Sequence, residues 1–154
     1  MSAGPSRARV TARLAQLQDA YDGFDVRQTT VSVAPTEFEQ AVEGSDVVAR
    51  AAVRVRDADG RYLVVPDTDE WVDPGGPIST GQSIVDTAVG LVERQTGVTP
   101  HIDELDRVSI VCVNSDEPGD EPLYQLHALF RARPVEGEVS GDAEWREEPP
   151  FDVF

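Results

Sequence analysis

The sequence predicts a layered α/β (α+β) domain in which several strands surround one central helix. Three observations predict this fold class. Apolar residues recur at helical spacing through residues 84–95, and valine-rich runs typical of strands lie before and after that segment. The chain has 154 residues, which is enough for one domain with a core and too few for two ordinary domains.

Residues 1–45 form a predicted N-terminal extension. Its first helix is expected at 7–21, where apolar residues recur at the spacing of one helical stripe. The residues of this stripe are Val10, Leu14, Leu17 and Tyr21. A short β-type run follows at 26–33, and a second helix opens at Pro35. The extension is too small to bury a core alone, so we expect it to pack on the main domain.

The main domain, residues 46–154, opens with two predicted strands. We expect them at 47–56 and 61–65, joined by a hairpin turn at Asp57–Gly60. Trp71–Gly76 is expected to be a loop, because a proline and paired glycines interrupt regular elements.

A helix is then expected over 84–95. Gly97 follows at a position where helices end, and Pro100 forbids continuation. Two further strands are expected at 108–113 and 123–131. The segment between these strands and the tail of the chain are acidic and rich in turn residues, so both are expected to be irregular.

The charge of the chain is strongly negative. Asp and Glu number 29 against 13 basic residues, all of them arginine, for a formal net charge of −16. At molar salt the Debye length falls to about 3 Å, so self-repulsion is screened while carboxylates keep the surface hydrated. We interpret the charge as halophilic adaptation, with an acidic partner-binding surface as the alternative. The same charge argues against nucleic-acid and anionic-membrane binding, which need basic patches.

The sequence carries neither a membrane-length apolar run nor the pattern of a secretory signal, so we expect a soluble, cytoplasmic protein. Its one cysteine, Cys112, excludes an intramolecular disulfide and a multi-thiolate metal site. Cys112 lies in a strand-like run, where we expect a small buried residue.

The segment from Trp71 to Val98 contains a spaced pattern of glycines and aliphatic residues. It resembles the signature of the Nudix (MutT-like) hydrolase superfamily, called the Nudix box, over residues 76–98. Aligned on Gly76, Gly97 and Val98 match the closing glycine and aliphatic residue without a gap. The resemblance covers about 46–150 and implies a Nudix-like α/β/α sandwich with a mixed sheet. The extension is similar in placement to those of some halophilic members, which suggests a haloarchaeal-type protein.

The box is degenerate. Gln82 stands at the first glutamate position, Gly90 and Leu91 replace an Arg-Glu pair, and Arg94 and Gln95 replace a Glu-Glu pair. In the family these glutamates hold divalent cations that bridge a diphosphate and activate a water molecule. Mg²⁺ requires oxygen ligands, which leucine lacks, and an arginine repels the ion. We therefore expect no metal at Gln82, Leu91, Arg94 or Gln95, although Mg²⁺ is the cofactor that the resemblance implies.

The remaining acids of the helix are Asp86 and Glu93. At about 100° per residue they lie at roughly 40° and 20° from Gln82, whereas the family's metal positions centre near roughly 170°. Both carboxylates are therefore expected to face solvent and not to replace the missing ligands.

Three box residues are candidates for substrate binding. Gly75 and Gly76 either form a tight turn or let the backbone approach a phosphate. Arg94 either makes a surface ion pair or binds a phosphate in place of the metal. His101, expected in a loop, and His127, expected in a strand, are interpreted as structural.

Acidic residues outside the box are weak candidates for catalysis. Glu117, Asp120 and Glu121 lie in a loop that either places a general base over the site or is an ordinary solvated loop. Glu144 belongs to an acidic segment with Trp145, whose side chain we expect to pack at an edge of the domain.

Three functional hypotheses follow. The first is a Nudix-type protein of hydrolase descent that binds a nucleotide or sugar-nucleotide with impaired or no cleavage. The second is an active Mg²⁺-dependent hydrolase, for example of ADP-ribose or nucleoside triphosphates, with ligands from outside the box. The third is a non-enzymatic partner-binding module whose extension supplies the interface. The resemblance also implies a homodimer, which is common in the family.

Overall fold

The computed structural model describes residues 4–43, 49–79, 81–116 and 122–150. The elements in these ranges are the helices α1 (Gly4–Ala20), α2 (Pro35–Glu43) and α3 (Ile84–Thr96), and the strands β1 (Asp25–Val33), β2 (Ala49–Val55), β3 (Tyr62–Asp67), β4 (Glu70–Val72), β5 (Gly75–Ile78), β6 (Val98–Ser115), β7 (Leu123–Gly137) and β8 (Glu144–Arg146). The mixture of strands and helices confirms the predicted α+β class.

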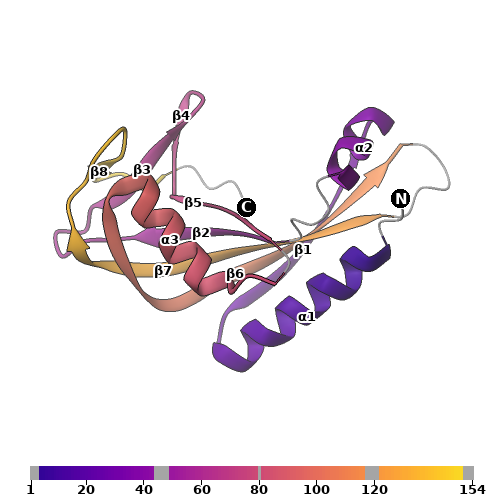
Figure 1. Ribbon diagram of the computed structural model, residues 1–154, viewed down its shortest axis with the longest axis horizontal. Coiled ribbons are helices and arrows are strands. Elements are labelled where there is room, and N and C mark those ends of the chain that lie inside the picture. Colours follow the sequence, from indigo (N-terminus) through magenta and orange to yellow (C-terminus); the bar gives the residue numbers. More distant parts are fainter. Residues whose placement is uncertain (1–3, 44–48, 80, 117–121, 151–154) are drawn as a thin grey trace.

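The strands form two sheets (Figure 1). A five-stranded mixed sheet has the order β1-β6-β7-β2-β5, in which β6 and β7 pair antiparallel at the centre. β1 pairs in parallel with β6, and β2 pairs in parallel with β7. The smaller sheet has the order β4-β3-β8 and is antiparallel. The core lies between the large sheet and the helices α1 and α3, whose apolar residues belong to one cluster with those of the sheet.

The extension contributes to this architecture in three ways. The stripe residues Val10 and Leu17 of α1 are buried against the core, as the helical spacing predicts. β1 becomes an edge strand of the large sheet. Phe38 of α2 packs with Val113 and Leu123, whereas the next residue, Tyr124, packs against the main core. Adjacent strand residues face opposite ways, so α2 covers the opposite face of the sheet. The domain division at residue 45 stays a prediction.

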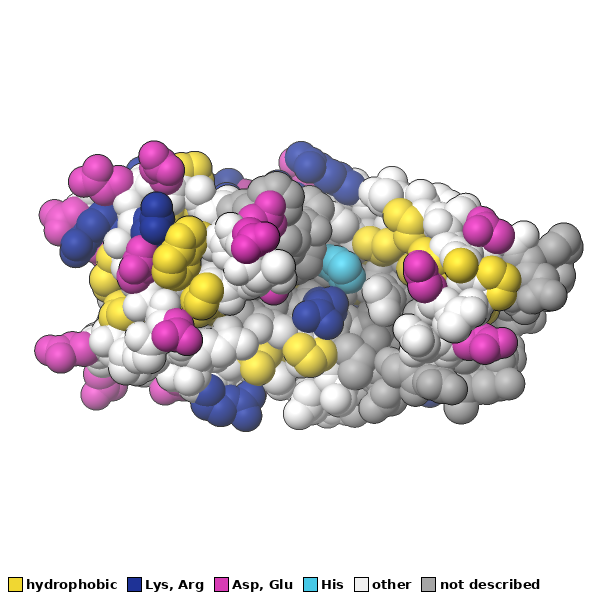
Figure 2. All heavy atoms as spheres, turned by 90° about the horizontal axis from the view of Figure 1, so that it is seen from above, with side chains coloured by type: hydrophobic (Ala, Val, Ile, Leu, Met, Phe, Trp, Pro, Cys, Tyr) yellow, Lys and Arg dark blue, Asp and Glu magenta, His cyan; other side chains and the backbone are white. Residues whose placement is uncertain are grey.

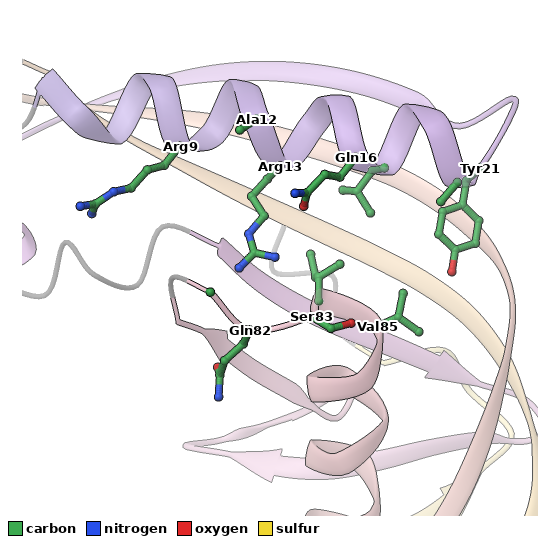
Figure 3. A pocket seen from close by; sticks show the side chains of 12 residues that line it. Arg9, Ala12, Arg13, Gln16, Tyr21, Gln82, Ser83 and Val85 are labelled. Carbon is green, nitrogen blue, oxygen red and sulfur yellow. The ribbon is translucent and has the colours of Figure 1, made fainter.

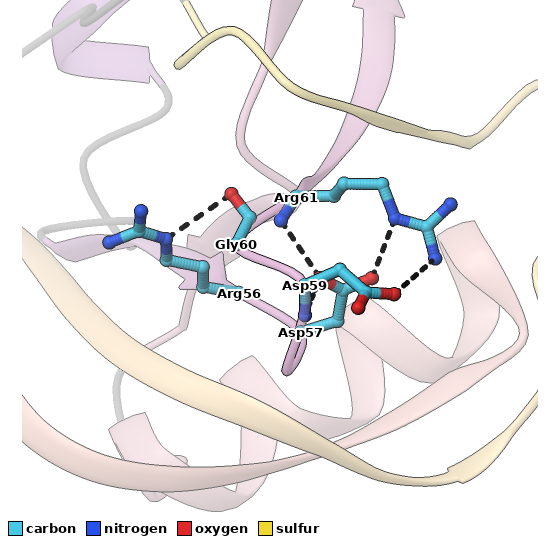
Figure 4. A network of polar contacts seen from close by, with 5 residues as sticks. All are labelled: Arg56, Asp57, Asp59, Gly60 and Arg61. Carbon is cyan, nitrogen blue, oxygen red and sulfur yellow. Dashed lines mark hydrogen bonds and ion pairs between the residues drawn. The ribbon is translucent and has the colours of Figure 1, made fainter.

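The predicted turn at Asp57–Gly60 forms, but its flanking strands do not make a hairpin (Figure 4). The Asp57 carboxylate accepts hydrogen bonds from the backbone of Asp59 and Arg61 and from the Arg61 side chain. Beyond a single bridge between Arg56 and Tyr62, the strands part, because β2 enters the large sheet and β3 the small one. The turn therefore joins the two sheets.

The central strands are longer than predicted. β6 begins at Val98, not at 108, and β7 continues to Gly137. The pairing between them shifts at three places, between Thr99 and Pro100 and twice more before residue 108. Such bulges break the alternation of buried and exposed residues, so the usual strand signal is lost there. The prediction that His101 lies in a loop was wrong for the same reason, since His101 belongs to β6.

The prediction of a loop over Trp71–Gly76 was also wrong, because this segment contains β4 and the start of β5. Gly75 pairs with Ala52 on β2 and has a φ of 154°. A Cβ atom at Gly75 would lie 2.0 Å from the carbonyl oxygen of Ala51. Glycine here is thus a condition for β5 to approach β2, not a signal that the strand is broken.

Helix α3 occupies the predicted position. Ser83 is its N-cap and accepts a hydrogen bond from the backbone of Asp86. Gly97, with a φ of 79°, ends the helix and donates to the carbonyl of Glu93. Asp86 and Glu93 are both exposed, as the helical wheel predicts. The helix buries Ile84, Ala88, Val92 and Thr96. The burial of this face fixes the directions in which the side chains at the box positions point.

Two other sequence predictions are confirmed. Cys112 is buried, and Trp145 of β8 pairs with Leu63 and packs partly buried at the edge of the core. Among the described residues, no helix is long and apolar enough to cross a membrane.

Gly75→Ala is expected to destabilise the fold by about 3 kcal/mol or more, because β5 and β2 must separate to admit the methyl group. Urea unfolding measures the change. Gly90→Ala is the matched control: Gly90 lies within α3 and a Cβ there meets no atom within 4 Å. It should stabilise the protein by about 0.5–1 kcal/mol. Equal effects of the two substitutions would contradict this account of Gly75.

Candidate functional site

A cavity of about 430 Å³ lies beside the glycines that open the box. Its walls come from β2, β3, the segment leading into β5, the end of α3 and the start of the turn before β8. The residues that matter for its chemistry are Arg50, Asp67, Asp73, Gly76, Gln95 and Asp142. Its size is that of a small-molecule site. We call it the box cavity.

Gln95 ties α3 to the backbone of β5. Its side-chain oxygen accepts a hydrogen bond from the Gly75 amide at 3.0 Å, and its side-chain nitrogen donates to the Gly75 carbonyl at 2.7 Å. A carboxamide offers one acceptor and one donor group and so satisfies both groups of the glycine. The only oxygen of this side chain is therefore already engaged.

The other box positions are also committed to structure. The side-chain oxygen of Gln82 accepts from the Ser79 amide at 2.9 Å. Leu91 is partly buried, packs against the core and faces Gly76, where an added Cβ would lie 3.4 Å from its methyl group. Arg94 is exposed and is not among the residues that line the box cavity. Within the described part of the chain it makes no ion pair, so the surface pairing considered for it is not formed there.

These residues do not fit a bound Mg²⁺. Leucine and arginine supply no oxygen ligand, and the two glutamines supply only neutral carboxamide oxygens, which balance none of the charge of the cation. Among the described residues, no group of three or more His, Cys, Asp or Glu side chains is placed to hold a metal ion.

Charged groups of both signs line the box cavity. Asp73 is 7% exposed and forms an ion pair with Arg54 at 3.0 Å, which neutralises it. Asp67 and Asp142 are exposed at the rim. Arg50 is exposed and makes no ion pair with another described residue. It is therefore a cationic group that can meet an anionic ligand.

The acidic candidates outside the box are not brought together by the described structure. Glu117, Asp120 and Glu121 lie outside the described residues. Glu144 is exposed, forms an ion pair with Arg146 at 2.9 Å and does not line the box cavity. Its near neighbour Asp142 does.

Sequence reasoning missed Arg50, Asp67 and Asp142. Arg50 alternates with the buried residues Ala49 and Ala51 and therefore reads as the solvent side of a strand. The two aspartates have no distinguishing signal, since one residue in every five or six of this chain is acidic. Only the meeting of β2, β3 and the turn before β8 identifies them.

His127 lies in β7, as predicted, and pairs with Arg50 across the sheet. Burial, together with the smaller effect of the Arg50 charge, lowers the pKa of His127 to about 4. The imidazole is therefore neutral at neutral pH. His101, in contrast, is exposed and lies 3.8 Å from the carboxylate of Asp103.

Comparisons with solved structures place the fold. The mutator MutT protein from Bacillus halodurans is similar at 27% identity and a TM-score of 0.52, over 64% of this chain and 67% of that one. The structure of a UDP-X diphosphatase is similar at 13% identity and a TM-score of 0.50, over 74% of this chain and 59% of that one. A NUDIX hydrolase from Nitrosomonas europaea shares 19% identity at a TM-score of 0.45, over 64% and 70% of the two chains.

No protein-family model and no curated protein matches the chain.

The neutral state of His127 predicts a pH dependence of stability. The folded pKa is about 4 and the unfolded value about 6.5, so the unfolded chain binds more protons between these pH values. Stability therefore falls as pH falls from 6.5 towards 4, with a contribution from this histidine of at most about 1.4 kcal/mol per pH unit.

His127→Gln should flatten this slope in urea unfolding measured at pH 6.5, 5.5 and 4.5. His101→Gln serves as control, because His101 is exposed. Comparison of the variants removes the common contribution of titrating carboxylates. A slope reduced equally by both substitutions would argue against the role of burial.

Proposed function

We propose that this chain, whose fold is that of the Nudix hydrolases, binds a nucleotide or sugar-nucleotide in the box cavity and is impaired in metal-assisted hydrolysis. Nudix hydrolases generally use divalent metals such as Mg²⁺. The proposal is that this protein descends from such pyrophosphohydrolases and keeps the binding pocket without the metal site.

The neutral and cationic side chains at the family's ligand positions carry the proposal. At the family's ligand positions the only oxygens belong to Gln82 and Gln95, and each accepts a backbone amide hydrogen bond. A carboxamide oxygen is neutral, so neither glutamine supplies the negative charge with which a carboxylate balances a divalent cation. The positive charge of Arg94 on the same helix further opposes a cation.

The box cavity retains groups suited to an anionic ligand. Arg50 provides a cation, and it shares the lining of the cavity with the backbone of Gly75 and Gly76. The volume of about 430 Å³ accommodates a nucleotide-sized molecule. Arg94 would add a second cation if a ligand extended over the helix.

One observation favours a second candidate function, an active hydrolase whose ligands come from outside the box. Asp67 and Asp142 both line the box cavity. Their carboxylate oxygens are ligands of the kind that Mg²⁺ prefers. The same assay therefore examines both candidates.

Acidic side chains are spread over the visible face of the molecule and do not form one compact patch (Figure 2). This distribution favours halophilic adaptation over a localised acidic partner surface. A cytoplasmic location and a homodimer remain predictions.

Calorimetric titration of the protein with ADP-ribose and a nucleoside-triphosphate panel in molar KCl is expected to show saturable binding. No turnover above background is expected with Mg²⁺ or Mn²⁺. Arg50→Gln should weaken binding about tenfold, because it removes a charge-assisted contact. Arg27→Gln, on the exposed strand β1, makes the same charge change and should leave binding unaltered.

Turnover with Mg²⁺ or Mn²⁺ that Asp142→Asn abolishes would support the active hydrolase instead. If none of the compounds binds saturably, both the nucleotide-binding hypothesis and the active-hydrolase hypothesis are contradicted.

Restoring carboxylates tests the loss of the metal site directly. The combined change Leu91→Glu, Arg94→Glu and Gln95→Glu is expected to create Mn²⁺ binding that the native protein lacks, as measured by electron paramagnetic resonance. The control is Arg27→Glu, Gln28→Glu and Thr29→Glu on β1, which adds the same negative charge at exposed positions. Equal Mn²⁺ binding by both variants would show only non-specific attraction to added negative charge, and it would contradict the loss of a metal site at the box positions.

A further inference from the structure

A second cavity, of about 550 Å³, lies between α1 and the start of α3 (Figure 3). One wall is α1, from Arg9 to its end at Ala20 and on to Tyr21. The other wall is the segment 81–85, where α3 begins. We call it the α1 cavity. It shares no lining residue with the box cavity.

The charge of the α1 cavity is opposite to that of the protein. Its described lining contains two arginines, Arg9 and Arg13, and no Asp or Glu. The whole chain has more than twice as many acidic as basic residues. Helix α1 itself carries three arginines and one aspartate. A locally positive hollow on an acidic protein attracts an anion that the rest of the surface repels.

Arg13 is held in place within this cavity. It is half-buried, and its guanidinium donates a hydrogen bond to the Ser79 carbonyl at 3.0 Å. One nitrogen is thus used to bridge α1 to the segment before α3, and the remaining donors of the guanidinium are left for a ligand. Figure 3 shows Arg13 reaching from α1 towards the segment before α3, with Arg9 pointing away from it at one end of the cavity and Gln16 further along the helix.

The start of α3 adds to the positive potential. The helix dipole places partial positive charge at its N-terminus, which forms one wall of the α1 cavity. Asp86, in the first turn of the helix, is exposed and does not line the cavity.

Apolar groups line the end of the α1 cavity that lies towards Tyr21. Leu17 and Ile84 are buried, and Val85 and Tyr21 are partly buried. Figure 3 shows the Tyr21 side chain at the end of the cavity away from Arg9. The cavity therefore has a cationic end and an apolar end.

We propose that the α1 cavity binds a phosphorylated small molecule that carries an apolar or planar group. Its phosphate meets the guanidinium group of Arg13, as charge-assisted hydrogen bonding favours, and the charge of Arg9 adds to the attraction. Its planar part lies against Tyr21 and Val85. The N-terminal extension thus supplies half of a binding site that is separate from the box cavity.

Backbone amide NMR titration with AMP locates the site by residue. Saturable shifts are expected for amides of 81–85 and of α1. AMP should bind more tightly than inorganic phosphate, which lacks the planar group, and than adenosine, which lacks the charge. Arg13→Gln should weaken AMP binding at these amides about tenfold, and Arg13→Lys should do so less.

Two controls separate this proposal from the function proposed for the box cavity. Arg27→Gln makes the same charge change on β1, and Arg50→Gln affects only the box cavity; both should leave the shifts at 81–85 unchanged. All proteins are compared at one KCl concentration, and dispersion of the amide spectrum reports their folding.

The proposal fails if AMP produces no saturable shift at 81–85 or α1 in the folded native protein. It also fails if Arg13→Gln and Arg27→Gln weaken these shifts equally, or if Arg13→Lys, while folded, loses as much affinity as Arg13→Gln. A loss of binding at the box cavity alone would leave the α1 cavity proposal intact and contradict only the proposed function.

Discussion

Helix α3 is held to the sheet by its buried side chains and to β5 by one carboxamide that satisfies both hydrogen-bonding groups of a glycine. Gln95 accepts from and donates to Gly75, and Gly75 in turn lies so close to β2 that no side chain fits. A glutamate at this position has only acceptors when ionised and would face the Gly75 carbonyl with a negative charge. Glutamine therefore suits this contact better than glutamate would.

Both cavities follow from this placement of α3. The end of the helix closes the box cavity, and its beginning meets α1 at the second cavity. The two cavities differ in charge. The described lining of the box cavity contains aspartates and Arg50, whereas the charged residues in the described lining of the α1 cavity are all arginines. In an acidic protein such a difference directs anionic ligands more strongly than the size of either cavity does.

Some elements of the fold could be predicted from the sequence and others could not. Helices α1 and α3 were predictable because their apolar stripes and, for α3, the Ser83 and Gly97 ends act locally. Strand β5 and the first half of β6 were not. Gly75 and Pro100 are residues that usually indicate the end of a strand. Here both lie within strands, because the neighbouring strands β2 and β7 accommodate them.

The sequence by itself determined the fold class, the central helix and the loss of glutamates from the box, since these depend on residue type and spacing along one segment. Only the tertiary structure decided that the glutamine oxygens are engaged, that Arg50, Asp67 and Asp142 share a cavity, and that Arg13 faces the start of α3. Each of these three arrangements brings together residues that are distant in the sequence. Their proximity arises from sheet order and packing, which no local pattern encodes.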